Sequence, residues 1–444
     1  MKTELKVEPR TLAGFMELQP SEQILFNQMA DKIRSSYERF GFLPLDTPIL
    51  ELSEVLLAKA GGETETQIYR FKKGNTDMSM RFDLTVPLAK YVAQNYGKLQ
   101  FPFRRYQIGK VYRGESPQKG RFREFYQADI DIIGDGELSI VNDAEIPSII
   151  YTTFRELGFD DFTIRINNRK ILNGFFKSLN LVELSPEIMR IIDKLDKVGK
   201  EVVTQLLIEI GLSENSVYKI IEFISIIGTN SEKINSLKEL GISDDLFLEG
   251  VKELEEIVTY IKLFGVPESN FMVDLTIARG LDYYTGTVYE TILNDYKQIG
   301  SVCSGGRYDN LAEYYTNKPL PGVGISIGLT RLFYQLNELK SIKAEKTSIS
   351  DVLVISASND IAPCLPIANS FRNEGINTEV YSGNKKIGTK FKYADRLQIP
   401  FVAIIGEDEV KNGTVSLKNL STGEQKELNI SEAIQLLKKD TLLK

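Results

Sequence analysis

Apolar side chains recur at helical spacing near the start of the chain, over residues 21–39. Pro20 and Ser21 mark a helix start, and Gly41 follows where a helix end is expected. Residues 42–50 then contain two prolines, and the residue before a proline disfavours the helical conformation. This pattern predicts a helix followed by an extended segment.

Two longer stretches, residues 103–113 and 121–134, alternate between apolar and polar positions on either side of a loop that contains Gly and Pro. A period of two is typical of a strand with one buried face, so the stretches predict a long β-hairpin. One face of the returning strand is predicted to be core and carries Tyr126, Ala128, Ile130 and Ile132. The opposite face carries Phe125, Gln127, Asp129 and Asp131.

Cations are concentrated on this hairpin, at Arg104, Arg105, Lys110, Arg113, Lys119, Arg121 and Arg123. A solvated face alone could account for the acids. However, the cations lie on the hairpin and its loop, and the acids lie deeper in the predicted sheet. This sorting indicates a pocket for a zwitterion beside a polyphosphate.

Before the hairpin, residues 78–83 alternate as a strand, and a helix is predicted from Thr85 to about Tyr96. Thr85 is a plausible N-cap, and Pro87 is tolerated in the first helical turn. Asp83 and Thr85 are therefore either capping residues or a carboxylate and a hydroxyl presented at the end of the strand.

The later periodicity predicts a helix over 139–157, a strand over 162–166, a strand entering a glycine turn over 300–309, and a strand turning into a helix over 321–332. Residues 168–270 are rich in Leu, Ile, Lys and Glu at helical spacing and predict an inserted helical domain. We expect the core in two parts, 1–167 and 271–338. A polar linker, 339–350, then leads to a separate α/β domain over 351–444. Its basic cluster of Lys385, Lys386, Lys390, Lys392 and Arg396 is a candidate phosphate contact.

Length and composition exclude several classes of protein. A chain of 444 residues suggests about two to four domains. No apolar run is long enough to span a bilayer, and no secretory signal is evident. The distant Cys303 and Cys364 fit a reducing cytoplasm, and a net charge of −7 leaves nucleic acid only local basic patches to bind.

The chain contains no His and no Trp. Ser–His triads and His metal sites are therefore excluded. Arg, Lys, carboxylates, Tyr and the substrate itself must carry any chemistry.

Residues 279–290 read RGLDYYTGTVYE and combine a cation, glycines, two phenols and small hydroxyls. Arg279 offers a planar fork of donors for phosphate or carboxylate. Tyr283 and Tyr284 combine an apolar ring with a polar tip. Taken alone, the stretch could also be a strand with a turn and an incidental ion pair.

Together the motifs resemble the histidyl-tRNA synthetase family, over nearly the whole chain and least in the helical insert. The stretches that carry the resemblance are RGLDYYTGTVYE, FRRYQIGKVYRGE, GRFREFYQADIDIIG, RFDLTVP, GGRYDNL and GISIGLTRL. The resemblance implies an α+β fold: a class II synthetase-type antiparallel catalytic sheet with helices, a mostly helical insertion and a C-terminal α/β anticodon-binding domain. It also implies a homodimer whose first helix and Pro48 strand form the shared edge.

The same resemblance assigns roles residue by residue. The implied histidine-binding residues are Asp83, Leu84, Thr85, Arg113, Gln127, Asp131, Arg279, Tyr283 and Tyr284. The implied ATP-binding residues are Arg113, Glu115, Arg121, Phe125 and Arg331, and the implied tRNA contacts are Gln118 and Lys119. Arg113 would bind the α-phosphate, and Arg279 would bridge it to the histidine carboxylate in place of a metal ion. These two arginines are the implied catalytic residues.

The implied reaction forms histidyl-adenylate from histidine and ATP and then transfers histidine to tRNA(His). Mg²⁺ would be bound through the ATP phosphates, with no prosthetic group and no membrane partner. Asn168 and Ser304 depart from the family pattern, and neither is expected to touch the pocket. Three alternatives stay open: the regulatory subunit of ATP phosphoribosyltransferase, a synthetase for another amino acid, and a non-catalytic tRNA-binding or signalling relative.

Overall fold

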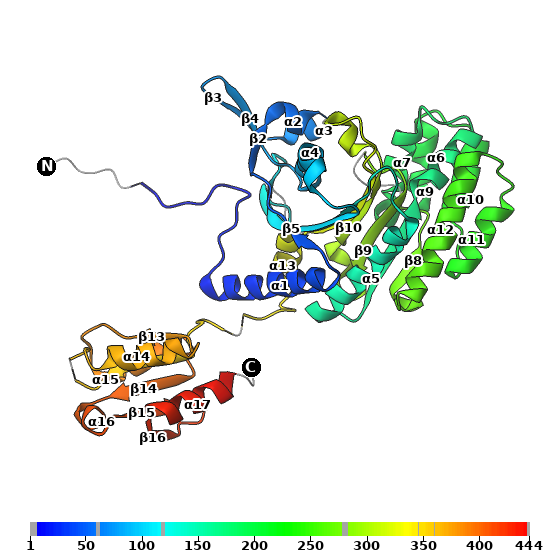
Figure 1. Ribbon diagram of the computed structural model, residues 1–444. Coiled ribbons are helices and arrows are strands. Elements are labelled where there is room, and N and C mark those ends of the chain that lie inside the picture. The colour runs from blue at the N-terminus through cyan, green and yellow to red at the C-terminus, as the bar shows by residue number, and fades with distance from the viewer. Residues whose placement is uncertain are drawn as a thin grey trace. The chain divides into compact units, whose positions relative to one another are not determined.

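The computed structural model describes residues 7–58, 63–116, 120–277, 283–344, 346–358 and 360–441 (Figure 1). The chain forms two compact units. One comprises Met1–Glu17 and Met29–Ser341, and the other comprises Leu18–Gln28 and Ile342–Lys444. Helix α1 (Pro20–Arg39) contributes residues to both. None of the helices in these described ranges is long and apolar enough to cross a membrane.

An eight-stranded sheet is the centre of the first unit, with the strand order β1-β5-β6-β11-β10-β9-β7-β8. The strands are β1 (Leu43–Pro44), β5 (Phe103–Tyr112), β6 (Glu124–Ile133), β11 (Gly322–Ile327), β10 (Ser301–Tyr308), β9 (Thr287–Leu293), β7 (Phe162–Asn168) and β8 (Phe271–Val273). Neighbours are antiparallel except at the two edges, where β1 pairs with β5 and β8 with β7 in parallel. The predicted α+β class with an antiparallel sheet is confirmed.

The predicted hairpin is formed by β5 and β6. In its register Asp131 lies opposite Arg105, and Asp129 lies opposite Gln107. On its other side β6 pairs with β11, which places Ser326 opposite Asp129. β6 is therefore a central strand, and Arg105 and Ser326 from its two neighbours lie opposite its acids.

Glycines in β10 and β11 let these strands approach closely. The sequence predicted a glycine turn after residue 300, but Gly305 lies inside β10. A Cβ atom on Gly305 would lie 2.1 Å from the carbonyl oxygen of Gly324. A Cβ atom on Gly324 would lie 2.3 Å from Oδ1 of Asp131. These glycines serve close packing against a buried carboxylate, and not chain reversal.

Helices and a smaller sheet complete the first unit. They are α2 (Ser53–Leu57), α3 (Glu63–Gln67), α4 (Thr85–Asn95), α5 (Ile140–Leu157), α13 (Leu329–Glu338), and the sheet of β2 (Leu50–Leu52), β4 (Thr76–Met80) and β3 (Arg70–Lys73). Short 3-10 turns lie at Tyr96–Lys98, Glu268–Asn270, Asn294–Ile299 and Leu311–Tyr314. Asp83 accepts a hydrogen bond from the Val86 amide at 2.9 Å. The cap of α4 is therefore supplied by Asp83, and the prediction that Thr85 caps it was wrong.

The predicted helical insertion contains seven helices, green in Figure 1. They are α6 (Arg169–Ser178), α7 (Ser185–Ile192), α8 (Leu195–Val198), α9 (Lys200–Glu209), α10 (Glu214–Ile224), α11 (Asn230–Glu239) and α12 (Asp245–Leu263). Gly174 and Gly250 allow α6 and α12 to touch, since a Cβ atom on Gly174 would lie 2.5 Å from the Phe247 nitrogen. The helices belong to the same compact unit as the sheet, and the insertion boundaries stay predictions.

The second unit contains a five-stranded sheet in the order β13-β12-β14-β15-β16. Its elements are β12 (Val352–Ser356), α14 (Cys364–Asn373), β13 (Thr378–Val380), α15 (Ile387–Arg396), β14 (Phe401–Ile405), α16 (Glu407–Asn412), β15 (Thr414–Asn419), β16 (Gln425–Asn429) and α17 (Ile430–Thr441). The β-α-β-α-β order was predicted, whereas the antiparallel pair β15–β16 was not. Lys390 was expected in a surface cluster, but it is 3% exposed and donates to the Ser356 carbonyl at 2.8 Å.

Candidate active site

A cavity of about 450 Å³ opens on the polar face of β6, β10 and β11. The predicted site residues that line it are Asp83, Thr85, Arg113, Glu115, Arg121, Phe125, Gln127, Asp131, Tyr283, Tyr284 and Arg331. They come from separate parts of the chain and are brought together by the strand order. Leu84 is fully buried and does not line the cavity. Arg279, Gln118 and Lys119 lie outside the described residues.

Arg113 follows the end of β5 and is held by aromatic rings. Its guanidinium lies 4.3 Å from the Phe82 ring centroid and 5.1 Å from that of Phe125. Its Nε donates to the Phe82 carbonyl at 3.3 Å. Burial lowers the pKa of Arg113, and the charges of Asp83 and Glu115 oppose the shift. The result is an oriented cation with donors left for a bound anion.

The hairpin ends add further charges at the cavity. Arg121 Nη1 lies 3.4 Å from Glu115 Oε2, and Arg123 Nε donates to the Glu115 carbonyl at 3.1 Å. Arg331, in the first turn of α13, donates from Nη2 to the Ile299 carbonyl at 2.5 Å. Three cations, Arg113, Arg121 and Arg331, therefore line one cavity, which is the electrostatic requirement for binding a polyphosphate.

Asp131 lines the cavity and is buried. Its Oδ1 accepts from the Tyr308 hydroxyl at 2.6 Å, and its Oδ2 lies 2.7 Å from Arg105 Nη2. The same Arg105 nitrogen donates to the Leu84 carbonyl at 3.0 Å. Burial raises the pKa of Asp131 to about 6, although Arg105 and Tyr308 oppose the shift. Arg105 and Tyr308 are supports for Asp131 that the sequence motifs did not single out.

The predicted phenols pack edge to face. The ring centroids of Tyr283 and Tyr284 are 5.0 Å apart, and those of Tyr283 and Tyr308 are 5.8 Å apart. Burial raises the pKa of Tyr283 well above its usual value, so its hydroxyl keeps its proton near neutral pH. Burial also raises the pKa of Asp83, opposed by the Val86 amide and by Arg113.

Sequence reasoning missed several residues of this cavity. They are Gly120, Phe122, Asp129, Ile277, Tyr289, Glu290, Ser301, Val302, Cys303, Ser304, Gly305, Tyr308, Gly324, Ile325, Ser326 and Gly328. The expectation that Ser304 avoids the pocket was wrong. Asn168 does not line the cavity. Its side chain caps α6 by accepting from the Lys170 amide, and it donates to Glu253. Alternation along β6 put Asp129 on the face of Asp131, which was the available signal for that residue.

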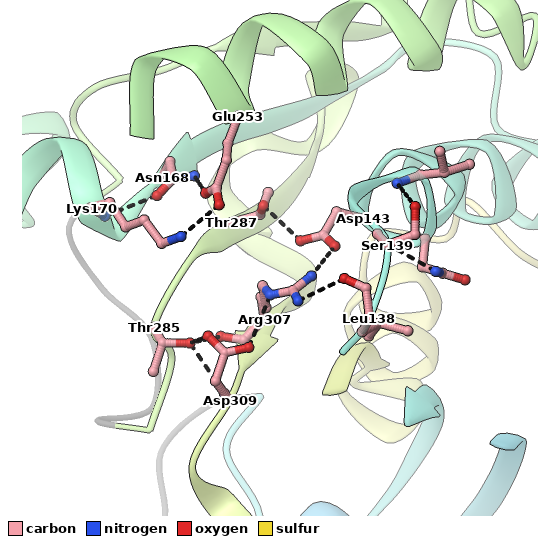
Figure 2. A network of polar contacts seen from close by, with 12 residues as sticks. Leu138, Ser139, Asp143, Asn168, Lys170, Glu253, Thr285, Thr287, Arg307 and Asp309 are labelled. Carbon is pink, nitrogen blue, oxygen red and sulfur yellow. Dashed lines mark hydrogen bonds and ion pairs between the residues drawn. The ribbon is translucent and has the colours of Figure 1, made fainter. Parts of the chain in front are cut away.

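A second polar network holds the strand that follows Tyr284 (Figure 2). Asp143 accepts from Thr287 Oγ1 and from Arg307 Nη1, each at 2.8 Å. Arg307 also donates to Asp309 and to the Leu138 carbonyl, and Thr285 donates its hydroxyl to Asp309 at 2.5 Å. Asp143 is fully buried. The network therefore fixes the backbone immediately after the two phenols.

Comparison with known proteins agrees with this arrangement. A family model described as "Histidyl-tRNA synthetase" matches residues 14–332. The chain belongs to the histidyl-tRNA synthetase family. A second model, described as "Anticodon binding domain", matches residues 351–440. Together the two matches cover most of both compact units of this chain.

Relatives are similar along their full length. The histidine–tRNA ligase of Clostridium tetani is 63% identical over 433 residues, which cover 97% of this chain and 98% of that protein. A crystal structure of histidyl-tRNA synthetase from Nostoc sp. PCC 7120 has a TM-score of 0.89 and 40% identity, covering 98% of this chain and 100% of that one. These similarities support an aminoacyl-tRNA ligase rather than a non-catalytic relative.

One more solved structure bears on the alternatives. It is titled an ATP phosphoribosyltransferase regulatory subunit/histidyl-tRNA synthetase from Bacillus halodurans C, with 19% identity and a TM-score of 0.74 over 90% of this chain and 99% of that one. At this identity the similarity shows a shared fold and does not separate the two functions.

The described residues show no metal cage of protein side chains. Within the described ranges, no group of three or more Cys, Asp and Glu side chains is placed to hold a metal ion. The cavity is instead lined by three arginines beside its carboxylates. This donor set suits a phosphate chain, and any Mg²⁺ would have to take most of its ligands from phosphate oxygens and water.

Proposed function

We propose that this chain attaches histidine to tRNA(His) through a histidyl-adenylate. The observation that carries the proposal is the single cavity in which Arg113 and Arg331 lie with Asp131 and the two phenols. The arginine cations in the cavity are suited to binding the phosphates of ATP. An acid beside phenol hydroxyls is suited to binding the imidazole ring of histidine. A site that pairs both ring nitrogens rejects isosteres, because its own polar groups would be left unpaired.

The first step is attack of the histidine carboxylate on the α-phosphorus, with release of pyrophosphate. Arg113 is the described residue best placed to stabilise charge on the transferring phosphoryl group, since its orientation is set by Phe82 and Phe125 before substrate binds. We assign Arg279 to the same phosphate and to the histidine carboxylate. Catalysis by such groups is positioning plus electrostatics.

The remaining ATP contacts follow from the positions around Arg113. We assign Phe125 to the face of adenine, Glu115 to its amino group, and Arg121 and Arg331 to the phosphates and the far side of the nucleotide. When bound, Mg²⁺ would neutralise phosphate charge, with the protein contributing arginines and not a cage.

In the second step, a terminal ribose hydroxyl of tRNA attacks the acyl carbon. No side-chain base is evident, so we assign the proton to an adenylate phosphate oxygen. Gln118 and Lys119 would meet the acceptor end, and residues 351–444 would bind the anticodon. The catalytic core would comprise 1–167 and 271–338, with the insertion at 168–270 and the linker at 339–350.

We also propose a cytoplasmic homodimer that joins through α1 and the segment around Pro48. Exposed apolar side chains in this segment support it, with Leu43 58%, Leu50 44% and Leu52 47% exposed. A run of exposed apolar side chains is expected to be covered by a second copy of the chain.

Pyrophosphate exchange tests the function. We expect ATP–pyrophosphate exchange that depends on histidine and is not supported by proline or threonine, and Arg279→Ala should slow it by orders of magnitude with the fold intact. Binding of histidine or tRNA without exchange would instead favour a non-charging relative, such as the regulatory subunit of ATP phosphoribosyltransferase.

A further inference from the structure

Among the residues that line the cavity, three buried acceptor atoms have no hydrogen-bond partner among the described residues: Gln127 Oε1, Asp129 Oδ1 and Asp131 Oδ2. Asp131 Oδ2 has an ion partner in Arg105, which leaves Gln127 Oε1 and Asp129 Oδ1. Gln127 is 9% exposed and Asp129 is 2% exposed, and both residues line the cavity. A buried acceptor without a donor destabilises a fold. Two of them side by side on one strand face indicate that a ligand supplies the donors.

Ser326 links the two residues. Gln127 Nε2 donates to Ser326 Oγ at 2.7 Å, and Ser326 also hydrogen-bonds to Asp129. Because the serine oxygen accepts from the amide, its own proton is available for the carboxylate. One N–H of the amide is thereby used, and the Gln127 atom without a partner among the described residues is its Oε1.

The charges around Asp129 also favour a cationic donor. Five carboxylates line the cavity, at Asp83, Glu115, Asp129, Asp131 and Glu290, and the buried cation Arg105 lies in contact with Asp131. Within the described ranges Asp129 makes no ion pair. It hydrogen-bonds to the neutral Ser326 hydroxyl, and the charge of Arg105 favours its ionised form. Burial raises the pKa of Asp129 to about 7, compared with about 6 for Asp131, which has Arg105 and Tyr308 as partners.

On the basis of the proposed function, we propose that Asp129 is a further specificity-determining residue of the histidine pocket. With Gln127 Oε1 it accepts hydrogen bonds from a cationic N–H group of the bound histidine. Either the α-ammonium or the imidazole ring supplies that group. Asp129 would then join Asp83 and Asp131 as a carboxylate that recognises the amino acid, and Ser326 would hold Gln127 and Asp129 in register.

The experiment measures histidine binding to the full-length chain by calorimetry and the KM values in pyrophosphate exchange. Asp129→Asn keeps the shape and removes the charge. We expect histidine binding to weaken about tenfold or more, the factor for one hydrogen bond to a charged group, with the KM for ATP changed less than about twofold. The melting temperature should stay equal or rise, because a buried charge without an ion partner is removed.

Asp135→Asn is the matched control. Asp135 lies just beyond β6, is exposed and accepts from the Tyr96 hydroxyl at 2.6 Å. It does not line the cavity, so histidine binding should not change. Ser326→Ala removes the link without changing charge and should weaken histidine binding less than Asp129→Asn. Imidazole propionate, which has the ring without the ammonium, separates the two sources, because its binding responds to Asp129→Asn only if the ring is the donor.

Failure of this inference is distinct from failure of the proposed function. A wild-type chain without histidine-dependent exchange would refute the proposed function. If the wild-type chain exchanges and Asp129→Asn binds histidine equally well, Asp129 has no role in recognition. A variant with a lower melting temperature and equal losses for histidine and ATP would assign Asp129 a structural role and overturn the inference.

Discussion

Asp143 of α5 and Arg307 of β10 form an ion pair in which Nη1 and Oδ2 are 2.8 Å apart, with side chains 0% and 12% exposed. The pair joins a helix to the strand beside the cavity, and Thr287 donates to the same carboxylate. Burial raises the pKa of Asp143 to about 6 despite Arg307. This relationship connects the stability of the fold with the position of Tyr283 and Tyr284.

Asp143→Asn should therefore destabilise the protein and loosen the phenols. The substitution removes one of the two carboxylates that pair with Arg307 and leaves it Asp309 alone. The expected loss is therefore at the lower end for breaking a buried pair, roughly 3 kcal/mol in the free energy of unfolding. Urea unfolding measures the loss, and the KM for histidine should rise more than the KM for ATP. The control is Asp160→Asn, whose exposed pair with Arg155 should contribute about 1 kcal/mol or less. Equal losses in the two variants would contradict the assignment.

Arg113→Ala should reduce the rate of adenylate formation about 100-fold or more, the size of effect seen when one transition-state donor is removed. Single-turnover adenylation measures this rate. Arg104→Ala is a close control, because Arg104 also stacks on a ring, with its guanidinium 4.5 Å from the Phe42 centroid, but pairs with Glu145 away from the cavity. We expect Arg104→Ala to change stability and leave the adenylation rate within about twofold.

Deleting residues 351–444 should spare adenylate formation more than tRNA charging. The cavity residues all belong to the first unit, whereas the deleted residues form the sheet of the second. Pyrophosphate exchange and aminoacylation, measured on the same preparation, give the two rates. If pyrophosphate exchange fell as far as tRNA charging, the assignment of adenylate formation to the first unit and tRNA binding to residues 351–444 would be wrong.

Gly324→Ala should damage the histidine end of the cavity. The added methyl group would lie 2.3 Å from both Asp131 Oδ1 and the Ile130 carbonyl. Overpacking of this kind costs about 1–3 kcal/mol in unfolding free energy, and displacement of Asp131 should raise the KM for histidine. Gly97→Ala is the control, since a Cβ atom there would meet nothing within 4 Å. For both variants, thermal unfolding measures stability and pyrophosphate-exchange kinetics measure the KM for histidine.

The pH dependence of stability should report on buried carboxyl groups. The chain contains no His, so no protein imidazole titrates between pH 5 and 8. The pKa values of Asp129, Asp131 and Asp143 are raised to about 7, 6 and 6. Folding therefore favours their protonated forms, and this contribution is complete below the unfolded pKa of about 4. It is lost as the pH rises through 6 and 7, so the melting temperature of the ligand-free protein should fall over that range.

Histidine binding should have the opposite trend, because an ionised carboxylate is the better acceptor for an N–H donor. The groups that set the pKa of Asp129 are Arg105, Ser326, Asp131 and Asp83, and Cys303 and Tyr37 also sense its charge. Asp129→Asn should flatten part of the decline in melting temperature. A melting temperature that rises from pH 5 to 8 in the wild-type chain would contradict the raised pKa values.

Local periodicity was sufficient for much of the fold. The hairpin of β5 and β6 was predicted from alternation, because a strand presents every second side chain to one face. The same rule put Asp129 and Asp131 on one side. Helix α1 was predicted from residues 21–39 and begins one residue earlier, at Pro20. The cysteine-poor and histidine-free composition also excluded whole classes of chemistry without any structure.

Tertiary structure decided which of these side chains are partners. Arg104 and Arg105 are adjacent cations in the sequence, yet Arg105 is fully buried near Asp131 while Arg104 pairs with Glu145. Alternation separates their faces but does not say what covers each face. That depends on residues distant in the sequence, namely Leu84 and Asp131 for Arg105 and Glu145 of α5 for Arg104. Lys390 shows the same limit, because its burial follows from packing on β12 and not from its neighbours in the chain.

The sequence by itself determined many of the elements, the family and eleven of the residues that line the cavity, because these depend on spacing along the chain. Only the folded sheet placed Ser326 opposite Asp129 and left Asp129 Oδ1 without a donor from the part of the chain that the structure describes. Such contacts depend on the register in which strands distant in the sequence pair, and the local sequence pattern does not specify that register.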